Sequence, residues 1–440
     1  MGLEILPVGG YSEIGRNCVA VKVDSEVVLL DLGLLMDKFI ELSEEREDLA
    51  PISGRRLIDH GAAPDVSVVK SLRGKVVAII PTHGHLDHIG AIPYLAGRFS
   101  CPVHSSPFTI EVIRRLLNDQ GVSLRGGLVA HPVNSTFALS KNIKVEFISV
   151  THSIPQTIIV VLHTPYGKVM YCNDFKLDNA PILGQRTNVK RLLALQGKVK
   201  VLIMDSLYAH ADKKCPSESI AKEMLKDVLL GVNSTGRVVI VTTFSSHIAR
   251  LKTLVDLAEK LGRKPVFLGR SIAKYVDAAH EAKIIDLKER VETVPFSSKV
   301  PKFLRKIKDF SKYLFIMTGH QGEPNAMLSK VVDRRLMPLK DGDHVVFSCT
   351  VIPVPINIEN RMRLEEKLKA RHVRIFKDIH VSGHAMREDH RDFLEMVRPE
   401  HIIPTHGSPE SLHKLKELAM ELGYLPKNVH ILHNGERVVF

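Results

Sequence analysis

Tryptophan is absent from this 440-residue chain, and aromatic residues make up only 5% of it. A broad platform of aromatic rings for stacking nucleic-acid bases is therefore excluded. Long apolar runs are also missing: none approaches the ~20 residues that a membrane-spanning helix needs, so we expect no membrane partner. The opening segment has neither the basic region nor the cleavage site of a signal peptide, and we expect the chain to carry none.

Cysteine is scarce and scattered along the chain. The five cysteines form no Cys-X-X-Cys pair and no spacing typical of a disulfide framework. Reduced, mostly buried thiols in a reducing compartment fit this usage best, so we expect a cytoplasmic protein. The five positions are Cys18, Cys101, Cys172, Cys215 and Cys349.

Positive charge is in excess. The chain has 61 lysines and arginines against 49 acidic residues, a net charge of +12 and a pI near 9.3. This balance favours a polyanionic partner, although a basic host proteome explains it equally well. The densest local group lies within residues 299–312 and contains Lys302, Arg305, Lys306 and Lys308. It is either a solvated helix face or a surface that follows phosphates.

The most informative stretch runs from Pro81 to Gly90. It contains three histidines and one aspartate within six residues: His83, His85, Asp87 and His88. Imidazole and carboxylate groups suit zinc and related divalent ions. The β-branched run before the stretch predicts a buried strand, and the residues after it predict the start of a helix. The four side chains are therefore expected on a strand-to-helix loop, where ligands can converge.

The spacing within this stretch predicts two ions rather than one. His83 and His85 are two residues apart, so both side chains can point the same way from an extended segment. Asp87 and His88 follow about one turn later and face a second position. Four polar residues that cluster on a loop by accident are a much weaker explanation of this order.

Strand and helix patterns alternate along the chain, which predicts a layered α/β fold. The length suggests two domains. After Asp205, buried strands expected at residues 237–242, 313–318 and 344–348 are each followed by a loop and a helical pattern. Such repeated units predict a second α/β domain with a mainly parallel sheet and crossover helices. Ser217 is the expected N-cap of its first helix.

The pattern His-X-His-X-Asp-His after a strand resembles the metal motif of the metallo-β-lactamase superfamily. This resemblance implies an αββα sandwich with further ligands at the ends of later strands. Residues of the right type stand in order at His152, Asp174 and His406. Asp31 occupies the position of the carboxylate that lies behind the ligands in that superfamily.

Because His406 follows the second domain, that domain interrupts the first. An insertion at this point resembles the β-CASP branch of the superfamily, which comprises nucleic-acid nucleases. Asp205 matches the acidic residue that ends the strand opening the insertion, and His380 and His384 match histidines near the return to the first domain. The expected limits are 1–204 and 376–440 for the metallo-β-lactamase domain and 205–375 for the β-CASP domain.

Within this branch the whole chain resembles the RNase J family in its shorter archaeal form. Residues 9–17 are similar to the family's opening segment, 242–250 to its RNA-contacting loop, and 318–324 to its loop on the phosphate side. Two departures concern the family's pocket for the RNA 5′ end. His320 stands where a small hydroxyl residue is common, and residues 347–355 lack the family's Ile-Pro-Gly-Asn-Glu.

The resemblance implies two zinc ions per chain, with manganese or magnesium as the alternative for one of them. The implied ligands are His83, His85 and His152 for one ion, Asp87, His88 and His406 for the other, and Asp174 as the bridge.

The same resemblance implies catalytic and RNA-binding roles. Asp87 is expected to accept a proton from the attacking water as well, and Asp31 and Asp205 to orient ligand imidazoles. His384 and His380 are expected to reach the scissile phosphate from the side of the inserted domain, to stabilise charge or protonate the leaving oxygen. The residues expected to contact RNA or its phosphates are Thr242, Ser245, Ser246, His320, Gln321, Ser348, Ser382, Gly383 and His384.

The implied function is that of a zinc-dependent ribonuclease in RNA decay and processing. We expect a 5′–3′ exoribonuclease that prefers 5′-monophosphate ends, with added endonuclease activity. Its substrate would be single-stranded RNA with the 5′ end in the cleft between the domains, and the enzyme would be a homodimer. Three alternatives stay open: an endonuclease of the RNA 3′-processing type, a metallo-hydrolase for a small ester or lactam, and a metal-bound RNA-binding scaffold without turnover.

Overall fold

The computed structural model describes residues 2–44, 52–352 and 354–440. The chain divides into two compact units. Unit 1 comprises Met1–Asn179, Gln185–Cys215 and Gly383–Phe440, and unit 2 comprises Ala180–Gly184 and Pro216–Ser382. Unit 2 therefore interrupts unit 1, as the order of the ligands requires.

The boundaries of the insertion differ from the expected residues 205 and 375. The strand that ends at Asp205 is paired on both sides with strands of unit 1, and after this strand the chain stays in unit 1 as far as Cys215. On return, the chain joins unit 1 at Gly383.

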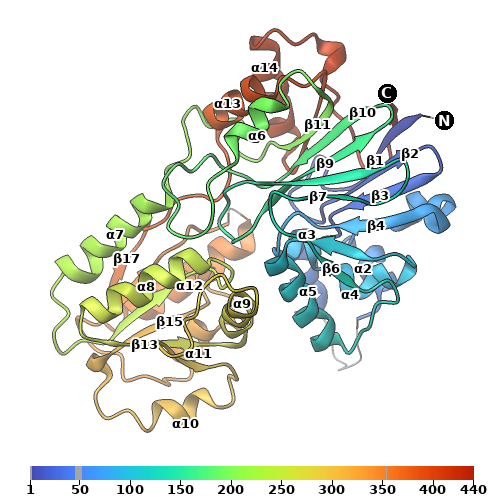
Figure 1. Ribbon diagram of the computed structural model, residues 1–440. Helices are drawn as coiled ribbons and strands as arrows, with labels where there is room; N and C mark the ends of the chain where they lie inside the picture. The colour runs from blue at the N-terminus through green and yellow to red at the C-terminus, as the bar shows by residue number, and fades with distance from the viewer. Residues whose placement is uncertain (1, 45–51, 353) are drawn as a thin grey trace. The chain divides into compact units, whose positions relative to one another are not determined.

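Two sheets form the centre of unit 1 (Figure 1). The first has the strand order β19-β1-β2-β3-β4-β5-β6. Strands β1 to β3 are antiparallel neighbours, β3 to β6 are parallel, and β1 pairs with β19 from the other end of the chain. The bounds are β1 Leu3–Gly9, β2 Cys18–Val23, β3 Glu26–Leu30, β4 Val76–Ile80, β5 Val103–Ser105, β6 Leu128–Ala130 and β19 Val438–Val439.

The second sheet of unit 1 has the order β18-β11-β10-β9-β8-β7. Strands β7 to β10 are antiparallel, whereas β10, β11 and β18 are parallel. Strand β11 precedes the insertion and β18 follows it, so this pairing closes unit 1 across the interruption. The bounds are β7 Thr136–Ala138, β8 Lys144–Ser149, β9 Ile158–Thr164, β10 Gly167–Cys172, β11 Val199–Asp205 and β18 His401–Thr405.

The core of unit 1 lies between the two sheets. Val19, Val28, Phe147, Val160 and Ile203 are fully buried there, and the first two come from one sheet and the last three from the other. Alternate residues of a strand face opposite sides, so each sheet also presents an apolar outer face that helices cover. Figure 1 shows α6, α13 and α14 outside the second sheet, and α4 and α5 outside the first.

The helices of unit 1 begin and end as follows: α1 Met36–Glu44, α2 Gly54–Asp59, α3 Leu86–Ile89, α4 Ile92–Leu95, α5 Pro107–Gln120, α6 Val189–Ala194, α13 Arg387–Val397 and α14 Pro409–Glu421, with the 3-10 helices η1 Val66–Lys75, η2 Ala96–Arg98 and η4 Pro426–Asn428. In the part of the chain that the structure describes, no helix is both long and apolar enough to cross a membrane.

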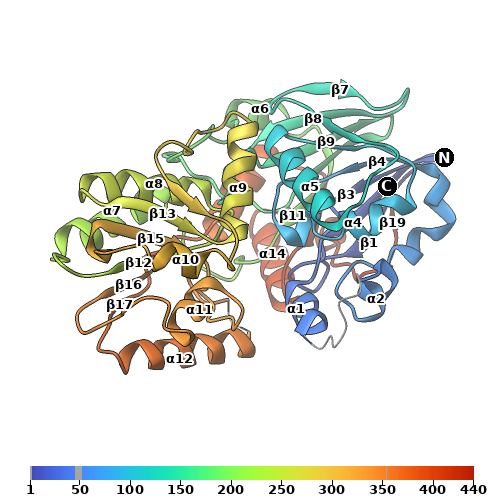
Figure 2. The same ribbon diagram turned by 90° about the horizontal axis from the view of Figure 1, so that it is seen from below.

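Unit 2 is built on one parallel sheet with the order β14-β13-β15-β12-β16-β17. Helices cover both faces, with α7 and α8 on one side and α11 and α12 on the other (Figure 2). The bounds are β12 Val239–Thr242, β13 Lys264–Leu268, β14 Glu292–Val294, β15 Tyr313–Met317, β16 His344–Phe347, β17 Arg374–Phe376, α7 Glu218–Gly231, α8 Ile248–Lys260, α9 Arg270–Glu281, α10 Val300–Leu304, η3 Phe310–Lys312, α11 Met327–Asp333 and α12 Pro355–Lys369.

The predicted layered α/β architecture is confirmed in both units. Strands β12, β15 and β16 coincide with the three predicted strands, and the Ser217 side chain accepts the N-cap hydrogen bond of α7 from the amide of Ser219. Strands β13, β14 and β17 were not predicted from the sequence. These runs are only three to five residues long, and β13 begins with Lys-Pro.

Candidate metal centre

The seven predicted ligands lie at the carboxyl ends of strands in unit 1. His83 and His85 follow β4, and α3 carries Asp87 and His88 one turn further on. The remaining ligands, His152, Asp174 and His406, follow β8, β10 and β18. Loops at the carboxyl ends of strands commonly carry the site in α/β folds, because the sheet fixes where each loop begins.

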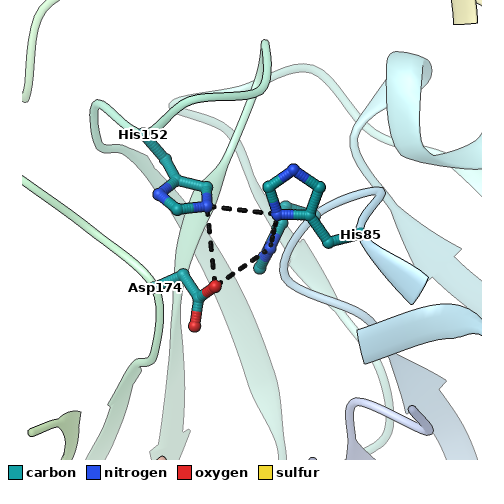
Figure 3. A group of neighbouring side chains, drawn as sticks. His85, His152 and Asp174 are labelled. Atoms are coloured by element: carbon teal, nitrogen blue, oxygen red, sulfur yellow. Dashed lines mark hydrogen bonds and ion pairs between the residues drawn. The ribbon is translucent and has the colours of Figure 1, made fainter. Parts of the chain in front are cut away.

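The first group consists of His83, His85, His152 and Asp174. His85 Nδ1 lies 3.0 Å from His83 Nε2 and 3.2 Å from His152 Nε2. Oδ2 of Asp174 lies 3.5 Å from His83 Nε2 and 3.5 Å from His152 Nε2. Figure 3 shows the side chains of His85, His152 and Asp174 pointing toward one another. Ligands on a tetrahedral zinc ion with bonds of ~2.0–2.1 Å lie about 3.3–3.4 Å apart, so these four atoms fit one ion.

The second group consists of Asp87, His88, His406 and again Asp174. Nε2 of His88 lies 3.4 Å from Asp87 Oδ2 and 3.2 Å from Asp174 Oδ1, and Nε2 of His406 lies 3.6 Å from that Oδ1. Each carboxylate oxygen of Asp174 therefore faces a different group. Within the described chain the buried Oδ1 atom accepts no hydrogen bond, as expected of an atom that binds an ion.

Burial keeps the ligands of the first group in their metal-binding form. It lowers the pKa of His85 to about 3, and it also lowers the pKa values of His83 and His152. A metal ion binds neutral imidazole, so these rings need not lose a proton first. The pKa of His88 is instead raised: burial opposes this, but the carboxylates of Asp174, Asp87 and Asp31 outweigh it.

Hydrogen bonds to the other ring nitrogen orient four of the five ligand histidines. Nδ1 of His88 donates to Asp31 over 2.7 Å, and Nδ1 of His152 donates to the main-chain oxygen of Gly383 over 2.6 Å. The remaining two pairs are His83 with Thr82 Oγ1 and His406 with Asn17 Oδ1, both at 3.0 Å. Such contacts fix the tautomer and aim the free nitrogen at the ion.

Asp31 organises the centre from behind. Its buried carboxylate accepts hydrogen bonds from the Thr82 amide at 2.7 Å and from the Tyr171 hydroxyl at 2.8 Å, besides the one from His88. Asp31 and His406 both adopt positive φ, +60° and +49°, which is uncommon for residues other than glycine. Backbone held in such conformations tends to occur at functional sites.

His384 lies at the rim of the centre. Its Nδ1 atom lies 3.1 Å from Asp205 Oδ2, and its Nε2 atom lies 3.7 Å from Asp174 Oδ2. Burial lowers the proton affinity of the ring, but Asp174 and Asp205 together raise its pKa to about 9. The His384 side chain is 19% exposed, whereas Asp205 is fully buried. The His384 ring is thus positioned beside the ligands, hydrogen-bonded to Asp205.

The returning chain places His384 on the side of unit 1, within the limits of 376–440 expected for the metallo-β-lactamase domain. His384 belongs to unit 1, because the returning chain is bound into that unit from Gly383 onward by the contacts to His152 and Asp205. His380 belongs to unit 2, where its Nδ1 atom is buried and has no hydrogen-bond partner among the described residues. The two histidines therefore have different surroundings.

Most of the residues predicted to contact RNA lie in unit 2. Thr242 ends β12 and His320 follows β15, so both stand at the carboxyl edge of its parallel sheet. The Thr242 hydroxyl and both ring nitrogens of His320 are buried without partners in the described chain. The His320 ring packs 4.1 Å from that of Phe244. The other predicted members in this unit are Ser245, Ser246, Gln321, Ser348 and Ser382.

Two of these side chains are already engaged within unit 2. The buried Ser348 hydroxyl accepts from Arg250 over 2.7 Å and donates to the Ile379 carbonyl over 3.0 Å. The amide of Gln321 donates to Thr350 and accepts from the Ile352 amide. Fully buried Arg250 is held in turn by Glu218. These polar groups therefore order the loops that carry the other candidates.

Asn17, Thr82 and Tyr171 were not predicted from the sequence as part of the site. Thr82 adjoins the metal motif, and Asn17 ends the segment 9–17. The contacts of Asn17 with His406, of Thr82 with Asp31 and of Tyr171 with Asp31 join segments far apart in sequence, and local spacing does not indicate such pairs.

Comparison with known families agrees with this geometry. A model described as the metallo-beta-lactamase superfamily matches residues 12–188. One for the beta-CASP domain of ribonuclease J matches residues 235–364, and one for a Zn-dependent metallo-hydrolase RNA specificity domain matches 371–432. A protein named ribonuclease J from Methanocaldococcus jannaschii is 42% identical, over 100% of this chain and 99% of that protein.

The chain belongs to the ribonuclease J family. A second relative of that name, from Pyrococcus abyssi, is 41% identical over 99% of this chain and 97% of its own length. In Synechocystis, a ribonuclease J is 32% identical over 99% of this chain and 65% of the relative. These matches confirm the predicted family and the combination of metallo-β-lactamase and β-CASP domains.

One solved structure supports the assignment of the fold and nothing further. A protein of unknown function from Enterococcus faecalis V583 aligns over 100% of both chains with a TM-score of 0.68 and 16% identity. The family fold and the two ligand groups together support a metal cofactor in this ribonuclease J family member.

Proposed function

We propose that this protein is a metal-dependent ribonuclease that hydrolyses RNA phosphodiester bonds. The observation that carries the proposal is the position of Asp174, whose two oxygens each face one ligand group. A carboxylate shared in this way would hold two ions close together, the arrangement used by many phosphodiesterases. Relatives named ribonuclease J over nearly the full length support RNA as the substrate.

The two groups would each hold one divalent ion, zinc by preference because histidine-rich ligand sets favour it. The ligands would be those of the first and second groups described above. When bound, two such ions neutralise charge on the phosphate and lower the pKa of water. A zinc stoichiometry of two per chain is part of the proposal, with manganese or magnesium as the alternative for one ion.

His384 would be the group that protonates the leaving oxygen. Its Nδ1 atom is hydrogen-bonded to Asp205, which stabilises the charged ring and points Nε2 toward Asp174. The His384 side chain is 19% exposed, so the ring is not fully enclosed by the protein. Asp87, 25% exposed and next to His88, would accept a proton from the attacking water in addition to its role as a ligand.

Unit 2 would contribute contacts to the RNA backbone. The unpartnered polar atoms of Thr242, His320 and His380 are suited to bind phosphate oxygens, since buried polar atoms without partners are costly unless a ligand satisfies them. Ser245, Ser246 and Ser382 are also proposed to contact RNA, because the resemblance to the RNase J family implies it. Homodimer formation and a cytoplasmic location also remain proposals.

We propose 5′–3′ exonuclease activity with preference for a 5′-monophosphate as the main activity. Endonuclease cleavage of the RNA 3′-processing type is the alternative. Single-stranded RNA labelled on its 5′-terminal nucleotide, with a 5′-phosphate or a 5′-hydroxyl, separates the two. Labelled mononucleotide released first, and faster from the phosphorylated RNA, supports exonuclease action. A labelled internal fragment as the first product would reject it, and no cleavage of either RNA would reject the ribonuclease.

A further inference from the structure

The loop before β2 places one amide side chain against the second ligand group. Asn17 is 1% exposed. Its Oδ1 atom lies 3.0 Å from Nδ1 of His406, and its Nδ2 atom lies 3.1 Å from the main-chain oxygen of Asp87. The same Nδ2 atom lies 3.1 Å from Nε2 of His88. Three of the four members of the second group therefore contact Asn17.

The chemistry of these contacts settles the orientation of the amide. A main-chain oxygen can only accept, so the atom that faces Asp87 is the NH2 group. The amide oxygen of Asn17 then faces His406, and Nδ1 of His406 must carry the hydrogen. Its lone pair is consequently on Nε2, which faces Oδ1 of Asp174 over 3.6 Å. Asn17 thus selects the tautomer of His406 that can bind an ion.

Close packing holds Asn17 in this position. Its main-chain NH donates to the Asp87 oxygen over 3.0 Å, and its own oxygen accepts from Gly33 over 3.0 Å. A Cβ atom at Gly33 would lie 1.6 Å from the Asp87 oxygen, and one at Gly10 would lie 2.5 Å from the Asn17 side-chain oxygen. Glycine is therefore required at both positions, and the amide has little freedom to move.

The first group is oriented by other residues. Thr82 holds His83, and the Gly383 carbonyl holds His152. Among the hydrogen bonds of the described residues, none joins Asn17 to either of these rings. Asn17 therefore orients ligands of the second group without contacting His83 or His152 of the first.

We propose that Asn17 is the positioning residue of the second group and sets the affinity of its ion independently of the ion in the first group. This inference rests on the proposed two-ion function. Asn17→Ala removes both the acceptor for His406 and the donor to Asp87. Asn17→Asp keeps an acceptor of the same shape for His406, but it removes the donor and adds a negative charge.

The test measures bound zinc by elemental analysis across a series of chelator concentrations. The parent should hold two ions per chain. Asn17→Ala should lose one ion at a roughly 10–100-fold lower chelator concentration than the parent, which is the usual effect of removing a hydrogen-bond partner of a ligand. The other ion should be lost at the same chelator concentration as in the parent. The chelator concentration at which Asn17→Asp loses the ion of the second group should lie between those of the parent and Asn17→Ala. Asn188→Ala, which removes a cap of α6 in the same unit, is the matched control and should keep both ions.

The possible failures are distinguishable. Two ions of unchanged affinity in both Asn17 variants would overturn this inference and leave the proposed function standing. Equal weakening of both ions in the two variants, with a melting curve like that of Asn188→Ala, would also overturn it, because Asn17 would then support the whole centre. A parent chain that binds no ion would overturn the proposed function and this inference together.

Discussion

Nδ1 of His384 lies 3.1 Å from Oδ2 of the fully buried Asp205, and this contact joins the residue after the insertion to the strand before it. The other ring nitrogen is left facing the ligand Asp174. We predict that His384→Gln keeps the bound ions but slows single-turnover RNA cleavage by ~10²–10⁴-fold, the usual contribution of a positioned proton donor. Asp87→Ala should instead lose metal, since it removes a ligand.

Zinc content, RNA affinity and cleavage rate should be measured for both variants. His163→Gln alters a partly exposed histidine on β9 that contacts Glu146 and no metal ligand; it is the matched control and should keep the parent's zinc content, RNA affinity and cleavage rate. If His384→Gln loses zinc or cleaves at the parent rate, His384 is not the proton donor.

The metal ligands could be predicted from sequence because their chemistry is local or follows strand ends. His83, His85, Asp87 and His88 occupy one short loop, and a strand end is visible as an apolar run that stops at a polar residue. Asp174 could be placed in the same way, and the structure brings it to both groups.

Features that depend on pairing between distant segments could not be predicted. Asn17 meets His406 across 389 residues. The insertion begins after Cys215 rather than at Asp205, because the strand that ends at Asp205 pairs with β18 of unit 1. Periodicity within a segment carries no information on such contacts.

Our second prediction concerns the buried ion pair of unit 2. Arg250 and Glu218 are joined at 2.5 Å and 2.8 Å in the interior. Removing one partner of a buried pair leaves an uncompensated charge, so Arg250→Met should destabilise unit 2 by about 3–5 kcal/mol. Adding Glu218→Gln to that variant should recover part of the loss. Hydrogen exchange of the α7 and α8 amides provides the measurement.

The matched control is the surface pair Glu359 and Arg363 on α12, whose side chains are 56% and 64% exposed. A double-mutant cycle on this pair should give almost no coupling. Coupling between Glu218 and Arg250 as small as that of the surface pair would contradict the account.

The third prediction is a pH dependence of stability in unit 1. Burial alone would raise the pKa of Glu146, but hydrogen bonds from His163 and Arg191 lower it to about 2, below its ordinary 4.5. A depressed pKa stabilises the fold above pH 4.5, and this contribution is lost as pH falls toward 2. Glu146→Gln should therefore be less stable than the parent at pH 7, by about 1–2 kcal/mol.

Urea unfolding at pH 7, 5 and 3 checks this prediction, and the gap between parent and Glu146→Gln should narrow as the pH falls. Glu41→Gln breaks an exposed pair with Lys38 and should produce little gap at any pH. A gap for Glu146→Gln that stays constant from pH 7 to pH 3 would contradict the assignment.

The fourth prediction concerns the basic group around α10. Lys302, Arg305 and Lys306 are exposed, so they are available to phosphates. If they bind RNA, replacing all three by alanine should lower the salt dependence of RNA binding by up to ~0.7 in log–log slope for each lost contact with a single strand. Binding titrations between 50 and ~200 mM salt measure this slope.

A control of equal charge is available in unit 1. Lys70, Arg73 and Lys75 are exposed on η1, and replacing them by alanine removes the same net charge. If the salt dependence of RNA binding is unchanged in the α10 variant, or changes equally in both variants, the α10 group is an ordinary solvated surface and does not bind RNA specifically.

The central claim is that two ions joined by Asp174 cleave RNA, and a zinc titration of metal-free protein tests it most directly. Cleavage of single-stranded RNA and bound zinc are measured together at each point. The account predicts little cleavage after the first equivalent, full cleavage as the second equivalent binds, and no restoration in Asp174→Asn. Full cleavage by the metal-free protein under strong chelator, or with only one ion bound per chain, would contradict it.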